Sequence, residues 1–150
     1  MKIGDPLPEL TLDNQEGQSV QLHDFIGQNP LVVYFYPKDE TPGCIAEACS
    51  FRDQFDDFVE AGARVFGVSS DSVQSHKRFA TKYRLNFQLL SDPKRIAEKA
   101  FGVPRRLFGI MPGRVTYVFD IHGRLIHQFK SSLSPTKHIK EAIEALQKTS

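Results

Sequence analysis

The sequence predicts an α/β fold in which a mixed central β-sheet is flanked by α-helices on both faces and preceded by an N-terminal β-hairpin. Leu31 to Tyr36 is an unbroken β-branched and aromatic run, the pattern of a strand that is buried on both faces. From residue 31 to residue 101, strand-like and helix-like segments alternate. The chain then closes with two strands joined by a tight turn and with a final amphipathic helix.

The first half of the chain contains a hairpin, two buried strands and a long helix. The hairpin turns at residues 14–17, and the central strand follows at 31–36. A helix then ends at Ala61-Gly62, and four apolar residues recur on one of its faces: Phe51, Phe55, Phe58 and Val59. A second buried strand is expected at 64–69.

The second half begins with a helix that Ser72 can cap. The inward face of this helix is expected to hold Val73, His76, Phe79, Ala80 and Tyr83. A short strand at 87–90 follows, and Pro93 opens a helix to Phe101. Strands at 114–119 and 124–129 form a hairpin, and Ser134-Pro135 starts the last helix, whose inward residues are Ile139, Ala142, Ile143 and Leu146. This order is the thioredoxin layout, and no repeat or linker divides residues 1–150, so we expect one domain.

Composition argues against several classes of protein. The 150 residues hold 19 basic and 18 acidic side chains, so the formal charge of +1 gives no field for nucleic acid or for an anionic membrane. The start of the sequence lacks the apolar stretch of a secretory signal, and the longest apolar runs are strand-sized. We therefore expect a cytoplasmic protein. Its two cysteines are then poor material for a structural disulfide and better suited to catalysis or redox switching.

The informative segment joins the central strand to the helix after it. Pro42 and Gly43 place Cys44 in or beside the first helical turn, where free N–H groups and the helix dipole favour an anion. A thiolate is such an anion, and only the thiolate is a competent nucleophile. Open α/β sheets also place their sites at the carboxyl ends of central strands. Cys44 is therefore the leading candidate for a reactive group, and the alternative is a small side chain packed in the core.

The same segment resembles the peroxiredoxins. Their signature, Pro-x-x-x-Thr-x-x-Cys, is met by Pro37, Thr41 and Cys44. The fuller Thr-Pro-Gly-Cys, with Cys49 five residues after Cys44, is similar to the Q-type branch, also called bacterioferritin comigratory proteins. Further matches run along almost the whole chain: Gly4-Asp5-x-x-Pro8, Phe51-Arg52-Asp53, Phe101-Gly102-Val103 and Arg114-x-Thr116-x-Val118-x-Asp120.

The resemblance implies a thiol-dependent peroxidase that reduces hydrogen peroxide and organic hydroperoxides. It implies that Cys44 attacks the peroxide and becomes a sulfenic acid, and that Cys49 resolves this acid as an intramolecular disulfide. It also implies that Thr41 binds the peroxide oxygen, that Pro37 shields the sulfur, and that Arg114 stabilises the thiolate and the departing oxygen. Thioredoxin or a similar dithiol is the implied reductant, and a monomer is the default state of this branch.

The spacing of the two cysteines leads to a hypothesis about the disulfide. On one regular α-helix, residues five apart have Cα atoms roughly 8.6 Å from each other. Disulfides need less than about 7 Å. The first turns of the helix at Cys44 must therefore unwind for a bond to Cys49 to form, and they refold on reduction.

Other interpretations stay open. Cys49 can be a packed helix residue in a one-cysteine peroxidase, and a redox-sensing or binding module can use the same disulfide without turnover. A thiol–disulfide oxidoreductase of thioredoxin type is disfavoured because Cys-x-x-Cys is absent. Arg114 can be a surface charge at a strand start. Glu47, one turn after Cys44, can orient Arg114, although a solvated Glu is the simpler expectation.

No metal or cofactor is expected. The five histidines, at 23, 76, 122, 127 and 138, have no metal-ligand spacing with the cysteines, and the glycines form no phosphate-binding loop. The loop at 104–113 is unusually apolar for the branch that the chain resembles. Phe108, Ile110 and Met111 are candidates to line the approach to Cys44, to form a weak dimer contact or to close the core.

Overall fold

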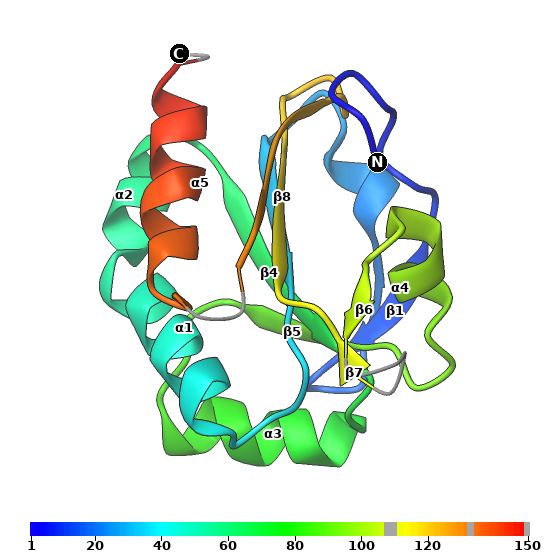
Figure 1. Cartoon of the computed structure of the whole chain (residues 1–150), viewed down its shortest axis with the longest axis vertical. Helices are drawn as coiled ribbons and strands as arrows, with labels where there is room; N and C mark the ends of the chain where they lie inside the picture. The colour runs from blue at the N-terminus through cyan, green and yellow to red at the C-terminus, as the bar shows by residue number, and fades with distance from the viewer. Residues whose placement is uncertain (107–110, 132–133, 149–150) are drawn as a thin grey trace.

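The structure of the chain is a computed structural model, which describes residues 1–106, 111–131 and 134–148. Its centre is a seven-stranded mixed sheet in the order β2-β1-β5-β4-β3-β8-β9 (Figure 1). The strands are β1 (Thr11–Asn14), β2 (Ser19–Gln21), β3 (Leu31–Phe35), β4 (Arg64–Ser69), β5 (Gln88–Ser91), β8 (Val115–Phe119) and β9 (Leu125–Lys130). β3, β4 and β5 are parallel, and β8 and β9 add an antiparallel pair beside β3. A separate ribbon pairs β6 (Arg105–Arg106) with β7 (Met111–Pro112).

Helices cover both faces of the sheet. One face carries α1 (Pro42–Asp53), α2 (Phe55–Glu60), α3 (Val73–Lys82) and α5 (Lys137–Gln147), and the other carries the 3-10 helix η1 (Leu22–Phe25) and α4 (Ile96–Phe101) (Figure 1). Alternate residues of β3 enter the two apolar clusters, because successive side chains of a strand point to opposite faces. Val32 and Tyr34 pack under α1 and α5, whereas Leu31, Val33 and Phe35 pack under α4. The thioredoxin-like fold expected from the sequence, with its N-terminal hairpin β1–β2, is confirmed.

The long helix expected to end at residue 61 is in fact two helices. Gln54 leaves the helical conformation, with φ −105° and ψ 20°, so α1 ends at Asp53 and α2 starts at Phe55. The break turns the face of α2 relative to α1. Phe51 and Phe58 are still buried, but Val59 is 55% exposed, and the expectation that it faces the core was wrong.

The helix expected to open at Pro93 begins later, at Ile96. Asp92 explains the delay, because its carboxylate accepts hydrogen bonds from the N–H groups of Ala97 and Glu98 and so fixes the start of α4. Arg95, between them, adopts a left-handed conformation with φ 57°. The last helix likewise starts at Lys137, after the expected Ser134-Pro135.

Candidate active site

Cys44 lies in the first turn of α1, two residues after the proline that begins the helix. Thr41 holds the N-cap position with extended backbone, φ −84° and ψ 148°. The first N–H groups of a helix have no partner inside it, so they and the helix dipole stabilise negative charge on Cys44. Its side chain is only 1% exposed, and both Cys44 and the half-buried Cys49 are free thiols in this helix.

Arg114 brings a positive charge to Cys44. It immediately precedes β8, and because Val115 pairs with Phe35, Arg114 comes to the end of β3 from which α1 departs. Its Nη2 donates to Cys44 Sγ at 3.4 Å. The side chain is 6% exposed, so the alternative of a solvated surface charge is wrong. A guanidinium has the planar geometry to hold a sulfur and a second acceptor at the same time.

Glu47 is that second acceptor. Arg114 Nη1 donates to Glu47 Oε1 at 2.6 Å, and the Glu47 side chain is 0% exposed, so the expectation of a solvated Glu was also wrong. Burial raises the pKa of Glu47 to about 8, although the guanidinium beside it acts in the opposite direction. The second carboxylate oxygen, Oε2, has no hydrogen-bond partner among the described residues and lies 3.7 Å from His138 Nδ1.

Gly43 makes room for this arrangement. A Cβ atom at Gly43 would lie 3.0 Å from Arg114 Nη2, closer than nearly all Cβ contacts in proteins. The glycine of the Thr-Pro-Gly-Cys segment therefore has a physical reason: it lets the guanidinium approach the first turn of α1.

Thr41 and Pro37 flank the same site. The Thr41 hydroxyl does not cap α1; it donates to the carbonyl of Lys38 at 2.8 Å, which leaves its oxygen able to accept a hydrogen bond. Pro37 is half-buried, two residues after the end of β3. Phe108 and Ile110, and the side chain of Met111, lie outside the described residues, so none of the three roles considered for them is tested.

His138 and Thr116 are residues of the site that the sequence analysis missed. His138, near the start of α5, is fully buried, and its Nδ1 lies 2.8 Å from Thr116 Oγ1 on β8. Its Nε2 lies 2.7 Å from the carbonyl of Ser131. Burial lowers the pKa of His138 to about 4. A signal was present, because His138 precedes Ile139 on the apolar side of the last helix, and a buried histidine needs polar partners.

A second buried polar cluster fixes the loop between β3 and α1. Asp39 lies in this loop, and its Oδ2 is 2.7 Å from Nδ1 of His76 on α3. Tyr36 donates its hydroxyl to Asp39 Oδ1 at 2.6 Å, and His76 Nε2 donates to the carbonyl of Leu90 at 3.1 Å. The cluster connects the loop that carries Thr41 to α3 and to β5.

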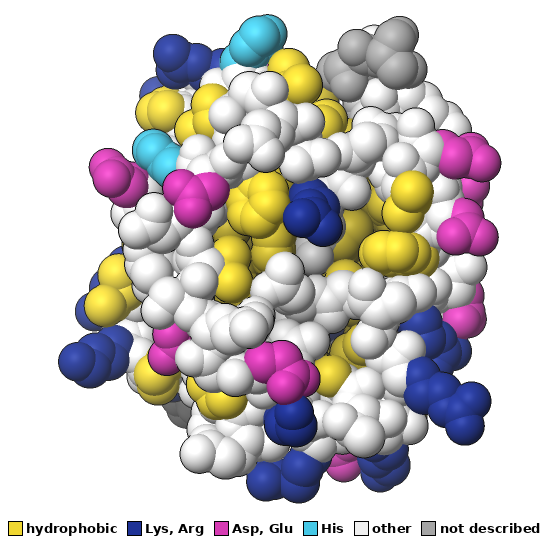
Figure 2. All heavy atoms as spheres, turned by 180° about the vertical axis from the view of Figure 1, so that it is seen from behind, with side chains coloured by type: hydrophobic (Ala, Val, Ile, Leu, Met, Phe, Trp, Pro, Cys, Tyr) yellow, Lys and Arg dark blue, Asp and Glu magenta, His cyan; other side chains and the backbone are white. Residues whose placement is uncertain are grey.

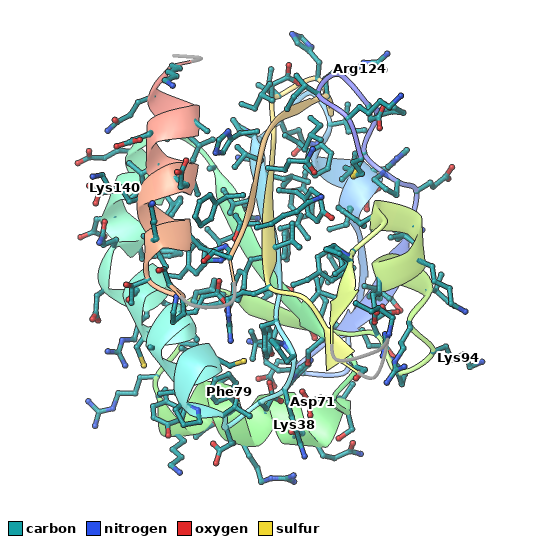
Figure 3. The ribbon with its side chains drawn as sticks, in the orientation of Figure 1. Lys38, Asp71, Phe79, Lys94, Arg124 and Lys140 are labelled. Carbon is teal, nitrogen blue, oxygen red and sulfur yellow. The ribbon has the colours of Figure 1, made fainter. Side chains whose placement is uncertain are left out.

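Asp39, Asp71 and His76 are also the described residues that come close enough to share a metal ion, with ligand atoms within 4.8 Å of one another. Asp71 lies next to this loop at the end of the sheet near α3 (Figure 3). Its Oδ2 accepts from the backbone N–H of Asp39 at 2.8 Å and from the Ser69 hydroxyl at 2.7 Å. Because the carboxylates already have protein donors, the geometry fits a hydrogen-bonded anchor better than a metal centre.

A surface groove lies away from Cys44. It is lined by the starts of β4 and β5 and by α2, with Phe55, Val59 and Leu85 among its apolar residues. Cys44 follows the opposite, carboxyl end of the parallel strands.

Figure 2 shows one face of the molecule, on which hydrophobic side chains gather around a basic one and other Lys and Arg side chains gather along the lower edge. None of the helices in the described ranges is long and apolar enough to cross a bilayer.

Comparison with known proteins gives consistent matches. The AhpC/TSA family matches residues 3–128. The chloroplastic peroxiredoxin Q of Sedum lineare is 51% identical over 144 residues, which cover 96% of this chain and 77% of that protein. The chloroplastic peroxiredoxin Q of Arabidopsis thaliana is 46% identical, over 95% of this chain and 66% of that protein.

These relatives contradict the expectation of a cytoplasmic location. That expectation tested only for an apolar secretory signal, which a transit peptide does not resemble.

Solved structures are similar over the whole fold. The crystal structure of the peroxidoxin BcpB from Mycobacterium tuberculosis has a TM-score of 0.92 at 34% identity and covers 100% of this chain and 99% of that one. A bacterioferritin comigratory protein from Xanthomonas campestris, described for its alkyl peroxide reduction activity, has a TM-score of 0.84 at 29% identity and covers 97% of this chain and 99% of that one.

Proposed function

The chain belongs to the AhpC/TSA family and is a thiol peroxidase with a two-cysteine mechanism, and we propose that Cys44 is its attacking cysteine and Cys49 its resolving cysteine. The contact that carries this proposal is the 3.4 Å hydrogen bond from Arg114 Nη2 to Cys44 Sγ in the first turn of α1. A buried cation, a helix N-terminus and a sulfur nucleophile meet there, and each of the first two favours the thiolate.

In the proposed reaction, the Cys44 thiolate attacks one oxygen of the peroxide and the O–O bond breaks. The sulfur becomes a sulfenic acid, and the other oxygen leaves with the electron pair as hydroxide or alkoxide, which takes a proton to give water or an alcohol. Arg114 stabilises the charge that moves onto the leaving oxygen, because a fixed donor in a water-poor site lowers such a barrier. The Thr41 hydroxyl, which donates its own proton to the Lys38 carbonyl, accepts a hydrogen bond from the bound peroxide, and Pro37 limits the access of water.

Cys49 then condenses with the sulfenic acid, releasing water and forming a disulfide. Both cysteines lie within α1, so the helical spacing of about 8.6 Å between their Cα atoms applies to the reduced protein. We infer that the first turns of α1 unwind to bring the sulfurs together. Thr41 and Cys44 then leave the positions in which they bind peroxide, which separates the peroxide step from the reductive step.

The disulfide is reduced by a dithiol, for which thioredoxin is the candidate that the family suggests, and the reduced helix re-forms. Hydrogen peroxide and organic hydroperoxides are the proposed substrates, in line with the alkyl peroxide reduction named for the Xanthomonas campestris relative. We propose that residues 1–150 act as one domain and as a monomer.

Turnover separates this function from a redox sensor. With excess peroxide and a dithiol reductant, the wild type should consume many equivalents of peroxide per chain, and Cys44→Ser should consume none. Consumption that stops near one equivalent in the presence of fresh reductant favours the sensing or binding module. Turnover that survives in Cys49→Ser with a monothiol but not with thioredoxin supports Cys49 as the resolving cysteine, whereas undiminished turnover with thioredoxin supports the one-cysteine alternative.

A further inference from the structure

Glu47 and His138 present two hydrogen-bond acceptors to each other inside the protein. The carbonyl of Ser131 can only accept, so His138 Nε2, 2.7 Å away, carries the ring proton. In the neutral ring Nδ1 then has a lone pair, and the Thr116 hydroxyl donates to it at 2.8 Å. Glu47 Oε2 lies 3.7 Å from the same Nδ1, and no residue in the described part of the chain donates a hydrogen bond to it. A buried acceptor without a partner is costly and calls for an explanation.

The charges around Arg114 also indicate that one of its two acidic partners keeps a proton. One guanidinium hydrogen-bonds to two acids, the Cys44 thiol at 3.4 Å and the Glu47 carboxyl at 2.6 Å. When both acids are ionised, two buried negative charges share one positive charge, which is unfavourable in a medium of low dielectric constant. When one of them keeps a proton, the buried group is neutral.

The remaining titratable groups near Glu47 do not remove this competition. Burial raises the pKa of the Tyr34 phenol on β3 well above its usual value, so that group stays neutral. Burial lowers the pKa of His138 on α5 to about 4, so the ring is also neutral near pH 7. Glu141, further along α5, is itself acidic and pairs with His127. Burial raises the pKa of Glu47 to about 8, which is consistent with a carboxyl group that can hold a proton at neutral pH.

We propose that Glu47 takes up a proton when Cys44 loses one, and that the resulting O–H competes with the Thr116 hydroxyl for the single lone pair of His138 Nδ1. The step is Cys44–SH plus Glu47–COO⁻ giving Cys44–S⁻ plus Glu47–COOH, with no net loss of a proton from the protein. The proton sits on Oε2, where a closure of about 1 Å brings it within hydrogen-bond distance of Nδ1. Arg114 is then left with the thiolate as its one counter-ion. Glu47 and His138 are positioning residues that act on Cys44 through Arg114, and the inference rests on Cys44 as the reactive thiolate.

The proposal predicts how the thiolate appears as the pH rises. The two acids titrate as a coupled pair, so the apparent pKa values belong to the pair. In the wild type, Cys44 should become a thiolate in two steps, the first shared with Glu47 and the second at higher pH, when the second proton leaves. Glu47→Gln fixes a neutral side chain beside Arg114, so the thiolate should appear in one step at low pH.

Two variants around His138 should act in opposite directions. His138→Gln can keep the donor to Ser131, but its amide oxygen is not held at the Nδ1 position as the ring nitrogen is. The ratio of thiolate to thiol after the first step should therefore fall about fivefold. Thr116→Val removes the hydroxyl that occupies Nδ1. The free lone pair then favours the Glu47 acid, and the thiolate fraction should rise. A purely structural role for these residues predicts loss of stability in both and no such pair of shifts.

The test measures thiolate absorbance in the ultraviolet against pH, with every protein carrying Cys49→Ser so that Cys44 alone is seen. Difference infrared spectra of the same samples report the C=O stretch of a buried protonated carboxyl. Glu141→Gln is the matched control and should leave both signals as in the wild type. We expect two thiolate steps and a carboxylic acid band that Glu47→Gln abolishes.

A single thiolate step in the wild type, with no acid band that depends on Glu47, overturns the proposal. The same result follows if His138→Gln and Thr116→Val shift the thiolate fraction in the same direction. The titration uses neither peroxide nor reductant, so its failure leaves the peroxidase assignment intact. Loss of peroxide turnover despite a two-step titration counts against the proposed function alone.

Discussion

Replacing Gly43 with alanine should separate the stability of the protein from the reactivity of Cys44. The new Cβ would lie 3.0 Å from Arg114 Nη2 and 3.8 Å from its Cζ, so the guanidinium must move by a few tenths of an ångström. Its present distance to Cys44 Sγ is 3.4 Å, and the movement is away from α1. The substitution removes no ionisable group of the site.

The size of the effect follows from the contact that is stretched. A hydrogen bond to a charged group contributes about 1.5–3 kcal/mol, and losing roughly half of it removes about 1.4 kcal/mol of the stabilisation that Arg114 gives to the Cys44 thiolate. The rate of reaction with peroxide at neutral pH should fall about tenfold, since 1.36 kcal/mol corresponds to a factor of ten. Alanine is a better helix former than glycine by up to about 1 kcal/mol, so the free energy of unfolding should stay the same or increase.

Stopped-flow reaction with peroxide, thiolate absorbance against pH and urea unfolding measure the three quantities. Ser50→Ala, two turns further along α1, is the control, because it also raises helix propensity. It should leave the rate and the curve of thiolate absorbance unchanged. A Gly43→Ala protein that reacts at the wild-type rate, with the wild-type curve of thiolate absorbance, would refute the argument that Arg114 must approach the first turn of α1.

Three further predictions concern the buried charges. Burial lowers the pKa of His138 from 6.5 to about 4, so between these pH values the unfolded chain binds a proton that the folded chain does not. The stability that comes from the neutral ring is therefore present above pH 6.5 and lost as the pH falls toward 4. Burial raises the pKa of Glu47 from 4.5 to about 8, so its contribution is present below pH 4.5 and lost as the pH rises through 8. In urea titrations, His138→Gln retains only the effect of Glu47, so its free energy of unfolding should fall from pH 4.5 to 8. Glu47→Gln retains only the effect of His138, so its free energy of unfolding should rise from pH 4 to 6.5. Equal slopes in the two variants would contradict this. His76→Phe leaves the buried Asp39 carboxylate without its partner at 2.7 Å and should lower the free energy of unfolding by about 3 kcal/mol, whereas a loss near zero would mean that the pair contributes nothing. Arg114→Lys cannot hold the Cys44 sulfur and the Glu47 carboxyl together and should lower the peroxide rate by about 100-fold without unfolding the protein, and a rate near wild type would show that a point charge suffices.

Local patterns predicted the elements that depend on local signals. The run Leu31 to Tyr36 is one, because a strand covered on both faces needs apolar residues at successive positions. The place of Cys44 is another, because Pro42 is a helix-start signal that acts on its neighbours. Two features were not predicted from the sequence. The break at Gln54 interrupts an apolar spacing that continues through it, and the late start of α4 depends on the Asp92 carboxylate, which accepts hydrogen bonds from N–H groups further along the chain.

The site residues also divide into those that the sequence indicated and those that depend on contacts between distant parts of the chain. The resemblance to the peroxiredoxins pointed to Arg114, but the burial of Glu47 follows from the pairing of β8 with β3, which spacing within one helix cannot reveal. His138 was judged only by its spacing to possible metal ligands. Its position beside Ile139 on the inward face of the last helix indicated a buried ring, and the structure adds the partners of that ring.

The central claim is that Cys44 is the sulfur that attacks and Cys49 the sulfur that resolves. One equivalent of hydrogen peroxide is added to reduced wild type, Cys44→Ser and Cys49→Ser, free thiols are counted, and the products are mapped by mass spectrometry. Rapid loss of two thiols with a Cys44–Cys49 bond in the wild type, no reaction in Cys44→Ser and a sulfenic acid on Cys44 in Cys49→Ser is the predicted result. Oxidation of Cys49 first, or a Cys44 that reacts no faster than an ordinary thiol, would contradict the account.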